Sequence, residues 1–384
     1  MTTTGGPHVC KRGVRCIYNF AYLSFVVLAY ALAASSTEHS FLQEWRTLNS
    51  PTYSFQQFMD YEVPRPYSYR VLMPALVNLL SRSEVIGRVT HDRALISRGA
   101  ILYDREHSVE AWSVDLQAKY LLTGFLMFVS LLLAMFSLRK ITFDLFPARA
   151  LADASPVLFA MFLPLTFRGD GGFMYDFTEL GLYCLGLHFL FRGDNCKFLI
   201  LIPIIILNKE AGLLVLPLSA IILFSTMNKK SACVQLANQS IVAIVAYLLI
   251  RSLFAGNPGS TAEFHLWGNL RFWSDIRNYL AMMSTSTFFI PVPKPNNIFL
   301  LSLFIVVILY RWKEKPLLIR RLLLAASVIN LPLFIVFCYR DEFRNLSLMY
   351  PFLHLLMCHS IMLHYGQPTA AGKDNVNGEA LGLQ

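Results

Sequence analysis

Long apolar runs recur along this chain, separated by short polar stretches. Eight of them approach the roughly 20 helical residues needed to cross a bilayer core of about 30 Å. They lie near residues 16–34, 118–138, 151–167, 174–191, 236–254, 297–311, 321–339 and 346–364. This pattern predicts an all-α protein, a polytopic bundle of transmembrane helices.

A further apolar region, residues 198–226, is interrupted at Asn208-Lys209-Glu210. As a single helix it would be about 42 Å long and would bury Lys209 and Glu210 at mid-membrane. As two short helices it forms a hairpin whose tip is these three residues. The arms are too short to cross a bilayer, so we expect the tip to lie at membrane depth beside a water-filled cavity, where irregular backbone is tolerated.

The placement of basic residues separates these two topologies, because cytoplasmic loops carry an excess of Lys and Arg. The hairpin gives about ten membrane segments, places both termini in the cytoplasm and collects most of the loop Lys and Arg on that side. A single helix inverts every later loop and moves the five basic residues from Arg311 to Arg321 outside. The hairpin is therefore favoured.

Composition agrees with a membrane protein and excludes other classes. Hydrophobic residues make up 55% of the 384 positions and charged residues only 15%, whereas soluble domains carry roughly 25% charged residues. Topology accounts for the net charge of +9, and no basic surface interleaved with aromatic residues indicates a nucleic-acid partner. The seven cysteines are odd in number and lack CxxC spacing, so they predict packing residues, with no disulfide framework or zinc site.

The chain predicts one transmembrane domain, residues 1–366, followed by a disordered cytoplasmic tail at 367–384 that is rich in Gly, Ala, Asn and charge. The first apolar run is too long for a signal peptide and predicts a signal anchor. We expect this domain to be integral to the membrane and multi-pass.

Two large outer loops, residues 35–117 and 255–296, mix apolar and charged positions. Residues 71–80 are apolar but too short to span, and residues 85–103 and 262–283 space large apolar side chains among Arg and Asp. These patterns predict amphipathic helices that lie on the membrane surface, the last of them as a lid or wall of a site.

The favoured topology gathers charged side chains from four segments on the outer face. Charges this close to a membrane are costly and indicate function by default. They supply carboxylates for base chemistry or metal binding, and cations for a phosphate. The residues are Asp60, Glu62, Arg65 and Arg70 in the first loop, Arg168, Asp170 and Asp176 in the next, Lys209 and Glu210 at the hairpin tip, and Glu342 and Arg344 before the last span.

Several of these features resemble the GT-C superfamily of integral-membrane glycosyltransferases, which take a sugar from a polyprenyl-phosphate carrier on the outer or lumenal face. The resemblance lies in the large first outer loop with a D-x-E pair (Asp60, Glu62), the juxtamembrane helices after it, and the acids of the next outer loop (Asp170, Asp176). Short segments, among them Asn208-Lys209-Glu210, also look like uncharacterised bacterial multispan proteins that carry an Asn-Arg-Glu element there.

The resemblance implies a bacterial inner-membrane protein that binds membrane lipid and a polyprenyl-phosphate sugar donor. A carboxylate base, Asp60, Glu62 or Asp176, would deprotonate the acceptor as it attacks the anomeric carbon with inversion. The leaving lipid phosphate asks for positioned cations. Substrate-binding roles are expected for Arg65, Arg70, Arg168, Asp170, Lys209, Glu210, Glu342 and Arg344. The expected cofactor is none, or a divalent metal on Asp60, Glu62 or Asp176, although no ligand spacing specifies one.

Other interpretations stay open. Asp170, between glycines, fits a turn; Asp176 fits a helix N-terminus favoured by the helix dipole; and Glu210 fits a structural ion pair with Lys209, Arg168 or Arg344.

A transporter or flippase could use the interrupted hairpin as a binding site, but no internal repeat with matching broken segments is present. A surface-polysaccharide polymerase or ligase would use the same residues, and the membrane-depth charges argue against a scaffold. Oligomeric state is left open.

Overall fold

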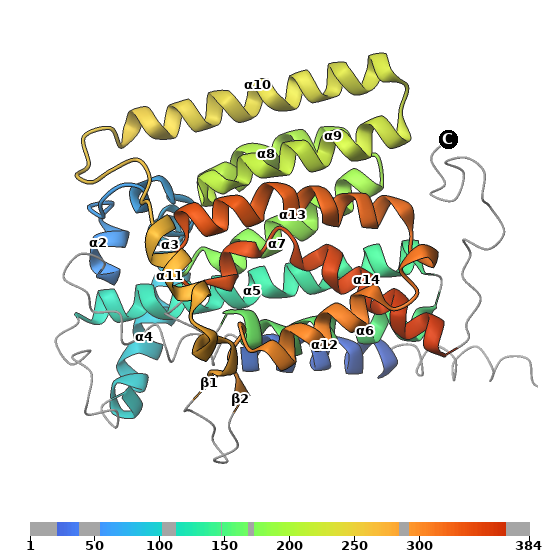
Figure 1. The fold of residues 1–384 in the computed structure, drawn as a ribbon. Helices are drawn as coiled ribbons and strands as arrows, with labels where there is room; N and C mark the ends of the chain where they lie inside the picture. Colours follow the sequence, from blue (N-terminus) through green and yellow to red (C-terminus); the bar gives the residue numbers. More distant parts are fainter. Residues whose placement is uncertain are drawn as a thin grey trace, which may run out of the picture.

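The computed structural model describes residues 21–37, 54–101, 113–146, 148–167, 173–283 and 292–365, and they are mainly helical. The long helices lie side by side with roughly parallel axes (Figure 1). They are Ala21–Thr37, α5 (Val114–Leu145), α6 (Arg149–Phe167), α7 (Asp176–Phe191), α8 (Asn195–Asn208), α9 (Val215–Thr226), α10 (Lys229–Leu253), α12 (Ile298–Leu309), α13 (Leu317–Phe337) and α14 (Tyr350–His364). The predicted helical class is confirmed, while the predicted tail at 367–384 lies outside the described residues.

Shorter elements connect these helices. They are α2 (Phe55–Met59), η1 (Tyr67–Tyr69), α3 (Leu72–Ser81), α4 (Glu84–Ile101), η3 (Glu210–Leu214), α11 (Leu266–Ser274), η4 (Ile276–Leu280), η5 (Trp312–Glu314) and η6 (Phe343–Leu346). Helices α3, α4 and α11 occupy the regions where the sequence predicts amphipathic helices. The described residues depart from an all-α fold only in a two-residue antiparallel pair, β1 (Met282–Met283) with β2 (Val292–Pro293).

Three helices within the described residues, α5, α10 and α13, are long and apolar enough to cross a membrane. Shorter apolar helices accompany them, including Ala21–Thr37, α8 and α12. Helix α10 lies at the edge of the bundle (Figure 1) and turns Ile241, Val245 and Leu248 outward, each more than half exposed. An apolar surface of this kind fits an integral membrane protein, because it would be costly in water and neutral against lipid.

The centre of the bundle is the packing of α5 against α7. Along α5 the fully buried Met127, Leu131, Ala134 and Leu138 recur at the helical period and form one face. Gly181 of α7 lies so close to α5 that a Cβ there would be 2.5 Å from the Ser130 carbonyl oxygen, so only glycine fits. This contact brings the first half of α7 against the middle of α5.

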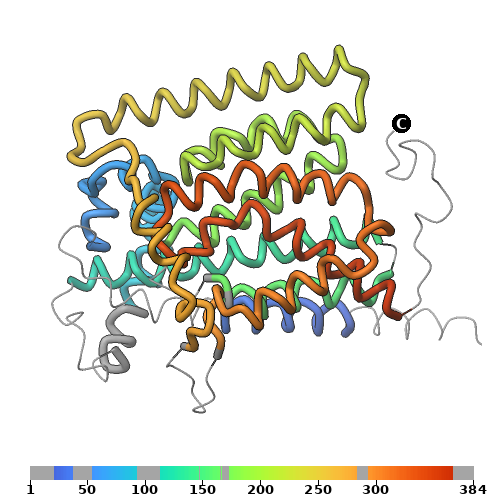
Figure 2. The backbone as a smooth tube through the Cα atoms, in the orientation of Figure 1, coloured from blue at the N-terminus to red at the C-terminus, as the bar shows by residue number. Residues whose placement is uncertain are grey.

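The chain reverses direction between α8 and α9, as the hairpin interpretation predicts. At the tip, the Asn208 side chain donates to the Tyr175 carbonyl oxygen (3.0 Å), just before α7 begins. At the open end, Asn195 at the start of α8 lies 3.9 Å from the Met227 sulfur, just after α9 ends. Figures 1 and 2 show both arms beside α10, and both contact it. The tip therefore lies where α7 starts.

The bundle has two different ends. The turns from α5 to α6, α7 to α8, α9 to α10 and α12 to α13 lie together at one end, which we call the opposite end (Figure 1). The hairpin tip, α3, α11, η6 and the start of α7 lie at the other, which we call the cavity end. The basic residues that the sequence assigns to the cytoplasm, such as Arg139, Arg149, Lys229 and Lys313, belong to the opposite end.

Candidate functional site

A cavity of about 370 Å³ lies at the cavity end, between segments that are distant in sequence. Four segments contribute charged or polar walls: residues 66–70 around η1, the start of α7, the hairpin tip, and η6 with the residue before it. A fifth wall comes from residues 261–265, ahead of α11. We call this space the polar cavity.

Asp176 is the centre of the buried ion pairs behind this cavity. Its Oδ2 atom lies 3.1 Å from Arg344 Nε and accepts from the Phe173 amide at 2.8 Å, and its Oδ1 atom lies 3.8 Å from Lys209 Nζ. Lys209 also donates to Glu179 Oε2 at 2.9 Å. Every member of this group is more than 90% buried. Buried charges of this kind persist only when paired, so α7, the tip and η6 are held together through these contacts.

Arg344 and Lys209 are joined a second time through η6. Arg344 Nη2 donates to Glu342 Oε1 (2.7 Å), Asn345 donates to Glu342 Oε2 (3.1 Å), and Lys209 Nζ donates to the Asn345 side-chain oxygen (3.0 Å). Burial disfavours the charged guanidinium, but the Glu342 and Asp176 carboxylates outweigh it and raise the pKa of Arg344 above its ordinary value. Its positive charge is therefore permanent.

Arg70 also lines the polar cavity and lies between two aromatic rings. Its guanidinium carbon is 4.8 Å from the Tyr67 ring centroid and 4.5 Å from that of Tyr175, and it donates to the Tyr175 hydroxyl. Arg70 Nη2 lies 3.5 Å from Glu210 Oε1, and the buried Glu210 Oε2 atom has no hydrogen-bond partner. Burial opposes its charge, but Glu210 and its other neighbours raise the pKa of Arg70 above the ordinary value.

The wall of the polar cavity formed by residues 261–265 carries an acidic and basic pair that sequence reasoning missed. His265 Nε2 lies 3.4 Å from Glu263 Oε2, and the Tyr67 hydroxyl donates to the same Glu263 oxygen at 3.4 Å. Both side chains are about one third exposed. No spacing in the sequence marks them, because residues 261–265 reach the cavity only through the fold.

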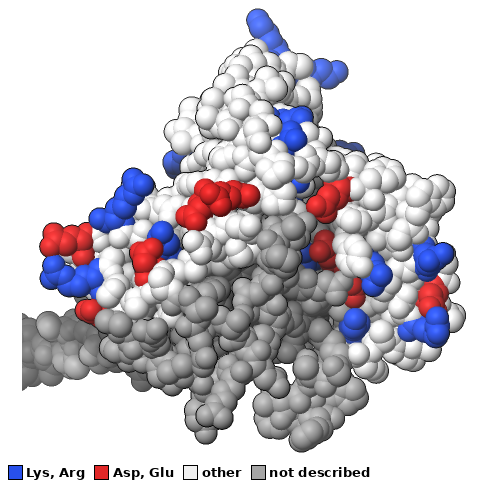
Figure 3. Space-filling view, turned by 90° about the vertical axis from the view of Figure 1, so that its left-hand side faces the viewer, with Lys and Arg blue, Asp and Glu red and all other residues white. Residues whose placement is uncertain are grey.

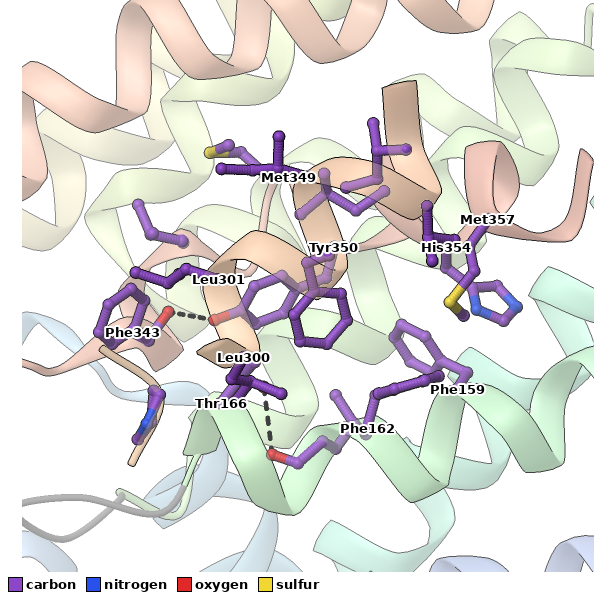
Figure 4. Close-up of a pocket in the computed structure, with 18 of the residues that line it drawn as sticks. Phe159, Phe162, Thr166, Leu300, Leu301, Phe343, Met349, Tyr350, His354 and Met357 are labelled. Atoms are coloured by element: carbon purple, nitrogen blue, oxygen red, sulfur yellow. Dashed lines mark hydrogen bonds between the residues drawn. The ribbon is translucent and has the colours of Figure 1, made fainter. Parts of the chain in front are cut away.

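A second cavity, of about 400 Å³, lies on the other side of η6 and is lined almost wholly by apolar side chains of α6, α12, α13 and α14. Phe343 and Leu346 of η6 line it, whereas Arg344 and Asn345 of the same turn line the polar cavity. Figure 4 shows Phe159 and Phe162 of α6 facing this space, with the Tyr350 hydroxyl directed at the Phe343 carbonyl oxygen. A single turn thus separates a charged cavity from a hydrophobic one.

Six of the predicted site residues meet at the polar cavity. Five of them line it, and Asp176 holds two of those five from behind; the five are Arg70, Lys209, Glu210, Glu342 and Arg344. The expected partners differ in detail: Glu210 pairs with Arg70, and Lys209 pairs with Glu179 and Asp176.

Three of the other predicted residues do not line this cavity. Asp60 ends α2 and is exposed, Glu62 is exposed, and neither lines the polar cavity; Arg65 does not line it either, and its backbone amide donates to Pro258. Arg168 and Asp170 lie outside the described residues. The catalytic roles predicted for Asp60, Glu62 and Asp176 stay predictions.

Within the described part of the chain, no three His, Cys, Asp or Glu side chains cluster as the ligands of a metal ion would.

Figure 3 views the cavity end and shows acidic and basic side chains interspersed across it, with neither sign dominating. Tyr175, Asn345, Glu263 and His265 are the functional candidates absent from the predicted set.

Comparison with known proteins adds no identity: no family model, no curated protein and no solved structure matches this chain.

Proposed function

We propose that this protein is an integral-membrane glycosyltransferase that moves a sugar from a polyprenyl-phosphate carrier to an acceptor on the outer face of the membrane. The reaction joins the acceptor oxygen to the anomeric carbon and releases the lipid phosphate. The observation that carries the proposal is the pair of cavities on the two sides of η6, one charged and one apolar.

The composition of the polar cavity suits a sugar phosphate better than a simple anion. Its charged walls combine three cations (Arg70, Lys209, Arg344) with three carboxylates (Glu210, Glu263, Glu342). A site for phosphate alone gains nothing from carboxylates, which repel it. A hydroxyl-rich group joined to a phosphate uses both, since carboxylates accept from hydroxyls and guanidinium groups donate to phosphate oxygens.

The apolar cavity suits the hydrocarbon part of the same donor. Its side chains give a lipid chain a surface equivalent to the membrane interior, and η6 brings that surface within one helical turn of Arg344. An amphipathic molecule lying across η6 would place its phosphate beside the cations and its chain among Phe159, Leu300 and Met357. Ligand sites that combine apolar walls with a few positioned polar groups have this organisation.

The proposal includes a topology of about ten membrane segments in a bacterial inner membrane, with both termini cytoplasmic. The basic turns at the opposite end support a cytoplasmic location for that end, because positive loops face inward. The polar cavity then opens on the outer face. Cysteines introduced at positions 229 and 230 test this orientation with a thiol reagent that does not cross the membrane. Labelling only from the cytoplasmic side is expected, and labelling from outside would show the opposite orientation.

The direct test is turnover by purified protein in lipid nanodiscs, supplied with a panel of polyprenyl-phosphate sugars and candidate acceptors. Release of lipid phosphate is expected from at least one donor, with sugar recovered on the acceptor. Asp60→Asn, Glu62→Gln and Asp176→Asn compare the predicted bases directly. Failure of the wild-type protein to cleave every donor in the panel would contradict the proposal.

A transporter or flippase is the second candidate, favoured by the interrupted hairpin whose tip lines the polar cavity, as broken helices do in carriers. The same donors in sealed proteoliposomes distinguish the two functions. A transferase cleaves the donor, whereas a flippase changes its leaflet and leaves it intact. A polymerase or ligase of surface polysaccharide would cleave the donor and add a saccharide longer than one unit.

A further inference from the structure

We propose that His265, oriented by Glu263, is the group that accepts the proton of the acceptor hydroxyl during sugar transfer. The inference rests on the proposed function and assigns a catalytic pair within the same cavity. Both side chains line the polar cavity and are about one third exposed, so an acceptor arriving from the surface can reach them. A distance of 3.4 Å joins His265 Nε2 to Glu263 Oε2, and such contacts are commonly long before substrate binds.

The position of this pair is built by contacts on both sides. Before it, Asn257 donates to the carbonyl oxygens of Tyr61 (2.9 Å) and Val63 (3.0 Å). Gly259 follows with a φ of +94°, and a Cβ there would be 2.7 Å from the Arg65 carbonyl oxygen. A non-glycine residue would be strained twice at this position, by its backbone and by its side chain. The segment is therefore fastened beside residues 61–65.

After the pair, Asn269 of α11 fixes the other side. This side chain is 1% exposed, donates to the carbonyl oxygens of Ile335 (2.8 Å) and Cys338 (2.6 Å), and accepts from the Arg340 amide (2.7 Å). The His265 amide itself donates to the Val336 carbonyl oxygen at 2.9 Å. His265 is thus held between the end of α13 and the η1 segment, and its ring contacts Tyr339 edge-on.

The chemistry of the pair fits a general base. Imidazole exchanges protons efficiently near neutral pH, and a neighbouring carboxylate fixes its tautomer and stabilises the imidazolium that forms. With Nε2–H directed at Glu263, the other ring nitrogen is the proton acceptor. The Tyr67 hydroxyl donates to Glu263 and holds its carboxylate in place, and the Arg70 guanidinium lies over the face of the Tyr67 ring. The base and one predicted phosphate-binding cation therefore share a wall.

Other carboxylates at this end are less suited to the step. Both oxygens of Asp176 face cations, and both oxygens of Glu342 accept from Arg344 or Asn345. Asp60 and Glu62 are exposed outside the cavity. Glu210 is the strongest rival, because one of its oxygens has no hydrogen-bond partner, but its charge is stabilised by Arg70.

The acceptor O–H bond breaks and its proton moves to the free ring nitrogen of His265. The oxygen forms the new bond to the anomeric carbon, and the carbon–oxygen bond to the phosphate breaks, leaving its electron pair on the lipid phosphate. Glu263 neutralises the imidazolium until the proton passes to water.

The test measures kcat and donor KM for His265→Asn, His265→Gln and Glu263→Gln, with His364→Asn, an exposed histidine at the end of α14, as the matched control. A lost general base lowers kcat by about 10² to 10⁴-fold. We expect this for both His265 variants with donor KM within about twofold, an intermediate loss for Glu263→Gln, and no change for His364→Asn. Added imidazole should restore part of the turnover of His265→Gly, which a structural role would not allow.

The outcomes distinguish a failure of the proposed function from a failure of the His265 assignment. If the wild-type protein cleaves no donor, the proposed function falls and the assignment of His265 falls with it. If the wild type is active and the His265 variants keep more than half of its kcat, only this inference is overturned. If Glu210→Gln alone abolishes turnover, the base is Glu210. Donor binding measured on each variant shows that a loss of kcat does not come from misfolding.

Discussion

The bundle carries a buried carboxylate between two arginine or lysine side chains at each end, and the two clusters differ in what surrounds them. At the opposite end, Asp153 Oδ1 accepts from Arg139 Nε (2.6 Å), and its Oδ2 accepts from the Tyr22 hydroxyl and lies 3.8 Å from Arg149 Nε. Its carbonyl oxygen accepts from Tyr30 (2.8 Å). This cluster ties the helix Ala21–Thr37, α5 and α6 together.

At the cavity end, Asp176 also lies between two cations, but Arg344 and Lys209 border the polar cavity with another face. The first cluster uses its charges to join helices, and the second does so while leaving charged groups accessible to a ligand. A buried ion pair is therefore weak evidence for function by itself. The cavity beside it is what distinguishes the two.

The largest expected difference between the clusters is in the stability lost when the carboxylate is removed. Asp176→Asn leaves Arg344 and Lys209 buried without their shared carboxylate, and breaking such a pair costs about 3–5 kcal/mol. Asp153→Asn should cost less, because Arg149 is 66% exposed and can be hydrated. Reversible unfolding in detergent measures both, and equal losses would show that the clusters are energetically alike.

Arg344→Lys and Arg139→Lys compare the cations. Lysine keeps the charge but cannot pair with Asp176 and Glu342 at once as the guanidinium does. We expect at least a tenfold loss of donor affinity for Arg344→Lys, about 1.4 kcal/mol, and less than twofold for Arg139→Lys. Isothermal titration with the donor checks this, and a similar loss in both variants would remove the cavity's special role.

Tyr175→Phe and Tyr30→Phe each delete one buried hydroxyl. Tyr175 accepts from Arg70, and Tyr30 donates to Asp153. The neutral bond of Tyr30 contributes about 0.5–1.5 kcal/mol and a bond to a charged group about 1.5–3 kcal/mol, so Tyr175→Phe should lose more stability than Tyr30→Phe. Only Tyr175→Phe should raise donor KM, since it frees Arg70 to move. An unchanged KM would place Arg70 outside the binding site.

The last comparison concerns pH. Lys315, in the turn before α13, is buried and donates to the Leu356 carbonyl oxygen and to Ser360, and burial lowers its pKa from 10.5 to about 8. Between these values the unfolded chain binds more protons than the folded one, so stability rises with pH from about 8 and levels off near 10.5.

Arg70 and Arg344 of the cavity end do not titrate there, because neighbouring carboxylates raise the pKa of each. Melting temperatures of wild type and Lys315→Met between pH 7 and 10 should therefore show a slope that the variant lacks. Parallel curves would show that the Lys315 charge is not penalised.

The local pattern of apolar and polar residues predicted much of this fold. The apolar runs predict the helices, Asn208-Lys209-Glu210 predicts the reversal between α8 and α9, and the mixed outer loops predict α3, α4 and α11. These features depend on the helical period and on the cost of burying charge, which are properties of neighbouring residues. The residues at the tip and in η6 were found for the same reason, since charge beside an apolar run is visible in the sequence.

By itself, then, the sequence determined a helical membrane protein, its chain reversal, and the separation of basic turns from the acids and arginines of the other end. Tertiary structure decided which of those charges meet. Asp176, Lys209 and Arg344 come together because α7, the hairpin and η6 end at one level, while Asp60 and Glu62 stay exposed. Glu263 and His265 reach the cavity only because Asn257, Gly259 and Asn269 fasten their segment to distant backbone. Such contacts depend on how helices pack, which no local spacing encodes.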